Sequence, residues 1–210
     1  FGNLLKVPSD NIPYPIFVYT GLLFWQFFSG ALSSTAGTLI SNQSIITKVY
    51  FPRLILPLSA VVTELVDFFV AGLMLVVLMF YFHYTPHLIG LLILPLLLLI
   101  TFLAAVGGGL FLASINVKYR DVRYALPFFI QLLIFITPVI YPISIVSEKY
   151  RWILALNPMT GVIETFKAAF LGTSGIPWET LLISIVASII FLLFGIWYFL
   201  KTEKTFADII

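Results

Sequence analysis

Long stretches of this sequence contain no Asp, Glu, Lys or Arg, and this feature limits the possible folds more than any other. Four such runs cover residues 16–47, 68–117, 124–147 and 180–200. A transmembrane helix needs about 20 mostly apolar residues, and the second run is long enough for two. Only 10% of the residues are charged, whereas soluble domains average about 25%. The excess apolar surface is therefore expected to face lipid.

The charge-free runs predict five membrane-spanning helices. The second run is divided by the segment HYTPH at 83–87, where Pro86 and two histidines indicate a turn. Open sheets cannot cross a bilayer, and the sequence shows no alternating pattern of the barrel type. We therefore predict an all-α polytopic membrane protein. The expected spans cover residues 16–40, 56–82, 89–114, 124–141 and 179–200.

The cations are distributed unevenly between the loops, which predicts the orientation. Three alternate segments, 41–55, 115–123 and 201–210, hold seven of the eleven Lys and Arg residues. Loops rich in Lys and Arg tend to stay on the cytoplasmic side. The C-terminus is thus predicted to be cytoplasmic and Phe1 external. One further span before Phe1 would place both termini inside and bring the total to six.

The segment 142–178 is too long and too apolar for a loop in water. Asn157 followed by Pro158 is a good helix start, and Gly172 stands where that helix would end. The pattern predicts short half-helices that enter the outer leaflet. Two interpretations stay open: an external gate, or an interfacial amphipathic hairpin that only packs. The predicted apolar stripe consists of Met159, Ile163, Phe166 and Phe170.

Several patterns argue against chemistry on this chain. It has no Cys, which excludes disulfides and Cys-based metal sites. A net charge of +2 without a basic run argues against nucleic acid. His83 and His87 have no third ligand nearby in the sequence, so we predict no metal site. The run Gly107–Gly109 lacks the context of a phosphate loop and predicts close helix packing instead. If the chain moves a substrate uphill, the energy must therefore come from elsewhere.

Glu64 and Asp67 fall on one face of a predicted span. Carboxylates inside a membrane are costly and often functional, which allows a proton relay. The uninterrupted apolar run, however, starts only at Phe68. We therefore favour a position near the cytoplasmic boundary, where both acids would cap the helix or pair with Arg53 or Lys48.

The segment INVKYRDVRY at 115–124 has the densest charge in the chain. It joins two predicted spans on the cytoplasmic side. Two interpretations are open: ordinary anchoring by positive charge, or docking of a cytoplasmic partner. The residues alone favour anchoring.

Longer segments resemble a known family. VKYRDVRYALPFFIQLLIFITPVIYP at 117–142 and NPMTGVIETFKAAFLG at 157–172 are similar to signature segments of ABC-2 type permeases that export polysaccharides. PYPIFVYTGLLFWQFFSGAL at 13–32 and TKVYFPRLILPLSAV at 47–61 also fit. The resemblance covers essentially the whole chain. It is strongest for O-antigen exporters, with capsule and teichoic-acid exporters nearby.

The resemblance implies a fold and a mechanism. Permeases of this family have six spans, external re-entrant half-helices and an amphipathic N-terminal helix, and they form homodimers. Residues 1–210 would then be one permease domain, without its amphipathic helix and first span. Two copies of a separate ATPase subunit, with ATP and Mg²⁺, would drive export of a glycan on an undecaprenyl-diphosphate-type lipid. The membrane would be the bacterial inner membrane, and this chain would hold no catalytic residue and no cofactor.

The resemblance also implies roles for particular residues. Contact with the ATPase is expected at Lys48, Arg53, Asn116, Lys118, Tyr119, Arg120, Asp121 and Arg123. The external gate is expected at Pro142, Asn157, Pro158, Met159, Phe166 and Phe170. Aromatic rings can stack on sugars, and the candidates for the substrate path are Tyr14, Tyr19, Trp25, Phe28, Phe135 and Tyr141. Arginine suits bidentate contacts with phosphate, so the candidates for the lipid diphosphate are Arg53, Arg120 and Arg123.

Other functions stay open at this point. The alternative to an O-antigen exporter is an ABC-2 permease for capsule, teichoic acid, a drug or a lipid. A proton-coupled secondary transporter would use Glu64 and Asp67, and its transport would survive depletion of ATP. A membrane scaffold without transport is a further hypothesis.

Overall fold

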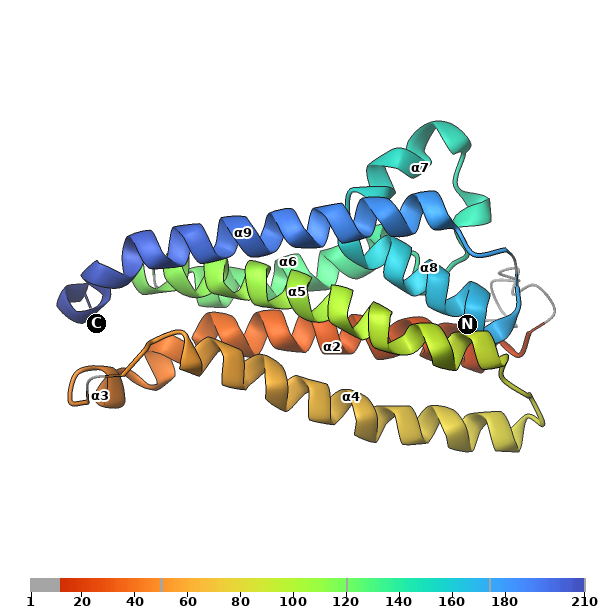
Figure 1. Ribbon diagram of the computed structural model, residues 1–210, viewed down its shortest axis with the longest axis horizontal. Helices are drawn as coiled ribbons and strands as arrows, with labels where there is room; N and C mark the ends of the chain where they lie inside the picture. Colours follow the sequence, from red (N-terminus) through yellow and green to blue (C-terminus); the bar gives the residue numbers. More distant parts are fainter. Residues whose placement is uncertain (1–11, 50, 120, 174, 210) are drawn as a thin grey trace.

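The computed structural model describes residues 12–49, 51–119, 121–173 and 175–209, and within these ranges all regular structure is helical. The longest helices run side by side along the long axis of the molecule (Figure 1). They are α2 (Tyr14–Ser41), α4 (Ile55–Tyr81), α5 (Leu88–Lys118) and α9 (Trp178–Ile209). The shorter elements are α3 (Gln43–Ile46), α6 (Val122–Ile136), the 3-10 helix η1 (Ile143–Ile145), α7 (Glu148–Ala155) and α8 (Pro158–Leu171).

Four of the five predicted spans are confirmed as helices long and apolar enough to cross a membrane: α2, α4, α5 and α9. The fifth prediction, residues 124–141, is wrong in extent, because α6 has 15 residues and ends at Ile136. At 1.5 Å per residue it extends about 22 Å, less than a hydrocarbon core of about 30 Å. Pro138 explains the ending: it disfavours a helical backbone at the preceding Thr137, which is extended.

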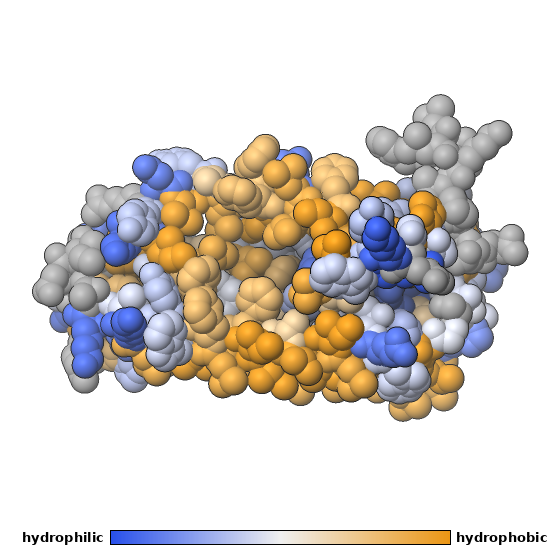
Figure 2. Space-filling view, turned by 90° about the horizontal axis from the view of Figure 1, so that it is seen from above, coloured by the Kyte–Doolittle hydropathy of each residue, from blue (hydrophilic) through white to orange (hydrophobic). Residues whose placement is uncertain are grey.

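The charged loops separate toward the ends of the bundle as the sequence predicts. The end with α3, the α5–α6 link and the C-terminus is called the cationic end; α7 and the α4–α5 turn lie at the opposite end (Figure 1). Figure 2 shows hydrophobic residues across the middle of the visible face and hydrophilic residues toward both ends. Helix α4 exposes large apolar side chains such as Leu73 and Phe80. This distribution is that of helices that face lipid.

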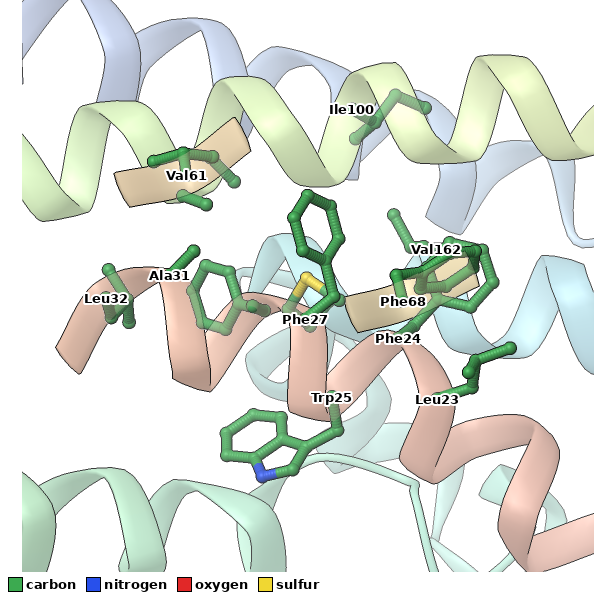
Figure 3. Close-up of a cluster of buried hydrophobic side chains, with 14 of the residues drawn as sticks. Leu23, Phe24, Trp25, Phe27, Ala31, Leu32, Val61, Phe68, Ile100 and Val162 are labelled. Atoms are coloured by element: carbon green, nitrogen blue, oxygen red, sulfur yellow. The ribbon is translucent and has the colours of Figure 1, made fainter. Parts of the chain in front are cut away.

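An aromatic cluster joins α2, α4 and α8 inside the bundle. Phe24 contacts Phe68 and Phe166 edge to face, with ring centroids 5.1 and 4.8 Å apart. Phe27, one turn along α2, packs on Phe68 as well, and Figure 3 shows these rings between the helices. Each such pair adds about 0.5–1.5 kcal/mol beyond the burial of its area. Helix α8 is thus part of the core although it is too short to cross the membrane.

Small residues let α5 approach α9 and α2 closely. A Cβ on Gly107 would overlap the backbone of Phe191 in α9, where Gly195 in turn faces Gly107. A Cβ on Gly109 would lie 2.7 Å from Cγ2 of Thr35 in α2. Only glycine allows such an approach between helix backbones. The prediction that this glycine run serves helix packing is therefore confirmed.

Candidate functional site at the re-entrant helix α8

Helix α8 begins and ends where its sequence predicts. The side chain of Asn157 accepts a hydrogen bond from the backbone N–H of Met159 at 3.0 Å, and Pro158 occupies the first turn. A proline there costs no helical hydrogen bond. At the other end Gly172 is left-handed, with φ 67°, a conformation that glycine adopts without strain. Both predicted boundaries are confirmed.

The helix is buried around almost its whole circumference. It lies between α2, α5 and α9, and Glu164 is its only residue that is not buried. The interpretation of α8 as an interfacial helix with one face in water is therefore wrong, because the side opposite the predicted stripe is covered as well. The expected gate residues in this helix, Pro158, Met159, Phe166 and Phe170, lie inside the bundle.

A lysine is enclosed in this arrangement. The side chain of Lys167 is 5% exposed, and its Nζ donates to the carbonyl oxygens of Pro138 at 2.9 Å and Val139 at 2.8 Å. The same ammonium group lies 3.9 Å from the centroid of the Phe17 ring, within the range of cation–π attraction. A buried charge is costly unless it has partners. These three contacts supply them.

A cavity of about 230 Å³ lies beside Lys167. Glu164, Arg151 and Tyr141 line it, together with proline side chains. Burial raises the pKa of the Glu164 carboxyl to about 7, against the opposing effect of the positive charges on Lys167 and Arg151. Burial lowers the pKa of the Lys167 ammonium, and the charge of Glu164 opposes that shift. The site therefore combines two cations, a carboxyl group and a phenol.

The sequence alone does not identify this site. It places Lys167 in the external segment 142–178 and gives Glu164 no role. The available signal is that these two are the only charged residues between Arg151 and Glu179. The carbonyl groups that receive the lysine lie 28 and 29 residues away in the chain, and such a distance cannot be deduced from spacing.

At the cationic end, the first pair of predicted coupling residues lies together. Lys48 and Arg53 line a cavity of about 820 Å³ with Glu203 and Lys204. Nη1 of Arg53 donates to the backbone carbonyl of Glu203, which connects the α3–α4 link to the C-terminal part of α9. Three cations around one hollow favour the approach of an anionic group.

The second predicted coupling segment contains one buried member. Asn116 is fully buried, and its Nδ2 donates to the backbone carbonyl of Ala36 at 2.8 Å. The prediction of a direct partner contact is therefore wrong for Asn116, because this bond holds α5 to α2 inside the chain. Arg120 lies outside the described residues. The exposed members of the segment are Lys118, Tyr119, Asp121 and Arg123.

Two aromatic candidates for the substrate path are buried in the chain itself. Trp25 and Phe28 are 5% and 9% exposed, and their ring centroids lie 6.0 Å apart. Trp25 points away from Phe27, to the other side of α2 (Figure 3). Neither ring offers a free face to a passing glycan in this conformation.

The other four candidates lie at separate places. Tyr14 begins α2, and the Tyr19 hydroxyl donates to the carbonyl of Ala71 in α4 at 3.0 Å. Phe135 is 65% exposed on α6, and Tyr141 lines the cavity beside α8. The six residues therefore do not line one common surface in this chain. Tyr141 is the member that belongs to the α8 site.

Glu64 contacts α2 instead of the predicted cations. It follows Ile55, the first residue of α4, by nine positions, or about 14 Å along the helix axis. Its Oε1 accepts a hydrogen bond from Ser34 of α2 at 2.5 Å, and its carboxylate lies against Gly30. Arg53 bonds instead to a backbone carbonyl of α9. The predicted pairing of Glu64 at the cytoplasmic boundary is therefore wrong.

The chain is similar in sequence to a known family and to curated proteins. Residues 1–171 match the model of the family described as ABC-2 type transporter, up to the end of α8. An O-antigen export system permease protein RfbA of Klebsiella pneumoniae is 29% identical over 210 residues, which are 100% of this chain and 80% of the relative. A relative of the same name from Myxococcus xanthus is 36% identical over 169 residues, 78% of this chain and 64% of the relative.

A more distant relative is the polysialic acid transport protein KpsM of Escherichia coli. It is 22% identical over 177 residues, 80% of this chain and 66% of the relative. The family match covers well over half of the chain, and the four long apolar helices agree with it. The chain is a multi-pass membrane protein that belongs to the ABC-2 type transporter family.

Proposed function

We propose that this chain is the membrane subunit of an exporter that moves a lipid-diphosphate-linked, O-antigen-like polysaccharide across the bacterial inner membrane. The observation that carries the proposal is the similarity to an O-antigen export permease over the whole length of the chain. A separate ATPase, implied by the ABC-2 family, binds ATP and Mg²⁺ and supplies the energy. In this proposal two copies of the chain enclose the path.

The cationic end is the proposed contact with the ATPase and therefore the cytoplasmic end. Lys48, Lys118 and Arg123 are exposed there. Arg53 lines the wide cavity beside α9, and Arg123 lines a second cavity of about 510 Å³ between the α2 end and the start of α6. Guanidinium groups bind phosphate oxygens in pairs, which supports these two arginines as partners of the lipid diphosphate.

The opposite end is the proposed exit. Helix α8, which is itself a half-helix, lies within the bundle toward this end, and a cavity lined by charged residues lies beside it. Backbone that ends within membrane depth is tolerated where protein or a water-filled space surrounds it. We assign the gate to α8 and to the segment from Tyr141 to Asn157 that precedes it.

A capsule polysaccharide is the second candidate substrate, supported by the similarity to the polysialic acid transport protein. The identity is lower there and the aligned part of the chain shorter. Membership of an ATP-driven family removes the proton-coupled secondary transporter from the candidates. Vesicles that contain the complex distinguish the two glycans directly, because each lipid-linked polymer can be supplied in turn.

Charge reversal at the cationic end tests the proposed partner. In the K48E/R123E double variant we expect copurification with the ATPase to fall roughly tenfold, because two attractive contacts become repulsive. The K149E variant is the matched control, since Lys149 is exposed on α7 at the opposite end. Equal recovery of the ATPase with both proteins would contradict the proposed interface.

A further inference from the structure

Three separate elements meet at the amino group of Lys167. The lysine belongs to α8, the Phe17 ring belongs to α2, and the carbonyl groups of Pro138 and Val139 belong to the turn that follows α6. We call the two hydrogen bonds from Nζ to these carbonyl groups the Lys167 tie. It joins the external end of α6 to the re-entrant helix.

Helix α2 has a glycine where this lysine passes. A Cβ on Gly21 would lie 2.9 Å from the carbonyl oxygen of Val139 and 3.0 Å from Cε of Lys167. It would also lie 3.2 Å from the ammonium nitrogen. These distances are too short for an unchanged arrangement, so any larger residue at Gly21 must displace the side chain or the turn. Gly21 of α2 therefore provides the space that the Lys167 side chain and the turn after α6 occupy.

A second bond supports the same junction. Nδ2 of Asn157, the residue that caps α8, donates to the hydroxyl of Thr137 at 2.8 Å. Thr137 itself is buried and ends α6. The turn after α6 is thus attached to the start of α8 by Asn157 and to its later turns by Lys167. Just beyond this turn, Tyr141 and Pro142 line the cavity beside α8.

The chemistry of the tie needs a hydrogen-bond donor rather than an apolar side chain. A methionine would fill a similar volume, but it would leave two buried carbonyl groups without their donor. A buried acceptor that loses its donor carries its full desolvation cost. The tie therefore holds the turn against α8 until another force separates them.

We propose that Lys167 is a positioning residue that keeps the external opening of the export path closed, by tying the turn after α6 to α8 and α2. The inference rests on the proposed function, since it takes the α8 end as the exit. Passage of a glycan requires the turn to move relative to α8, and this movement breaks the tie. Its role is to set how often the exit opens without substrate.

The test uses the complex with its ATPase in sealed vesicles. Without ATP and substrate, the K167M variant should leak sucrose roughly tenfold faster than wild type, because two buried hydrogen bonds are lost. The K201M variant removes an exposed lysine from α9, outside the gate segment, and should stay as tight as wild type. A K167R variant, which keeps the charge and the donors, should recover part of the seal. If K167M stays sealed, packing alone suffices and the proposal is wrong.

A second variant keeps the proposal testable if K167M does not assemble. G21A keeps Lys167 in the sequence but displaces its side chain or the turn from the side of α2. The chain has no Cys, so spin labels at S144C in η1 and T173C just after α8 report the distance between η1, which follows the turn after α6, and the end of α8. We expect a broader distance distribution and a faster leak in G21A. Unchanged distances with an intact seal would overturn the tie.

The outcomes also separate this inference from the proposed function. Wild-type vesicles that move no lipid-linked glycan under ATP would contradict the function, whatever the leak of the variants. If wild-type vesicles export glycan but K167M vesicles leak no faster than wild-type vesicles, the result contradicts the tie and leaves the proposed function intact.

Discussion

Single buried polar groups hold the helices of this chain together. Asn116 bonds to the backbone of α2, and Lys167 bonds to the turn after α6. Each lies in surroundings where water is scarce, so the loss of one partner leaves the other unpaired. Such residues should therefore be sensitive to substitutions that conserve volume.

Asn116→Leu tests this expectation at α5. The variant keeps the size of the side chain but removes the donor to the carbonyl of Ala36. We expect a loss of about 1–3 kcal/mol, the cost of an unsatisfied buried acceptor, seen as a lower unfolding temperature in detergent. Ser33→Ala, an exposed position on α2, should unfold as wild type does. An unchanged temperature for Asn116→Leu would show that the bond contributes nothing.

Glu164 gives a prediction about pH. Burial raises the pKa of its carboxyl from 4.5 to about 7, so between these values the folded protein binds more protons than the unfolded chain. Stability from this group therefore falls as the pH rises through that window. Glu164→Gln removes the effect, and its stability relative to wild type should increase from about pH 5 to about pH 7. Thermal unfolding of both proteins across this range measures it, and a relative decrease would contradict it.

Local signals made some of these residues predictable and others not. Asn157, Pro158 and Gly172 define the ends of α8 through backbone chemistry confined to a few residues, so the sequence reveals them. Lys167 depends on carbonyl groups from a distant segment. The partner of Glu64 was wrongly predicted because nearby cations in the sequence suggested a pair, whereas its contacts depend on the packing of α4 against Ser34 and Gly30.

At the scale of helices, the charge-free runs predicted how long the helices are, and the glycine run predicted where two helices pack closely. The runs predicted α2, α4, α5 and α9, because each is one uninterrupted helix that is long and apolar enough to cross a membrane. They overestimated α6, where Thr137 before Pro138 ends the helix inside a run without charge. The apolar stripe of α8 predicted one covered face only. Its burial on nearly all sides depends on three surrounding helices that no single segment reveals.

Two glycines provide a matched test of helix contact. Gly107 lies against the backbone of α9, whereas a Cβ on Gly72 of α4 would meet nothing within 4 Å. Gly72→Ala should be neutral or stabilise the protein by about 0.5–1 kcal/mol, because alanine favours helix. Gly107→Ala should separate α5 from α9 and reduce the yield of folded protein, measured by size-exclusion chromatography in detergent. Equal yields would contradict the close packing.

At the scale of the whole molecule, the two ends differ in chemistry. Cations surround cavities at one end, where α3 and the C-terminus lie, and α8 with its enclosed lysine lies toward the other (Figure 1). Such a division suits a subunit that receives energy from a partner on one side and controls an opening on the other.

The most direct test of the account is ATP-dependent movement of glycan by the purified complex. Vesicles would contain this chain with its ATPase, and a lipid-linked O-antigen would be supplied on the ATPase side. The account predicts that glycan becomes accessible on the far side only with ATP and with both subunits present. Movement that follows a proton gradient without ATP, or ATP hydrolysis by this chain alone, would contradict it.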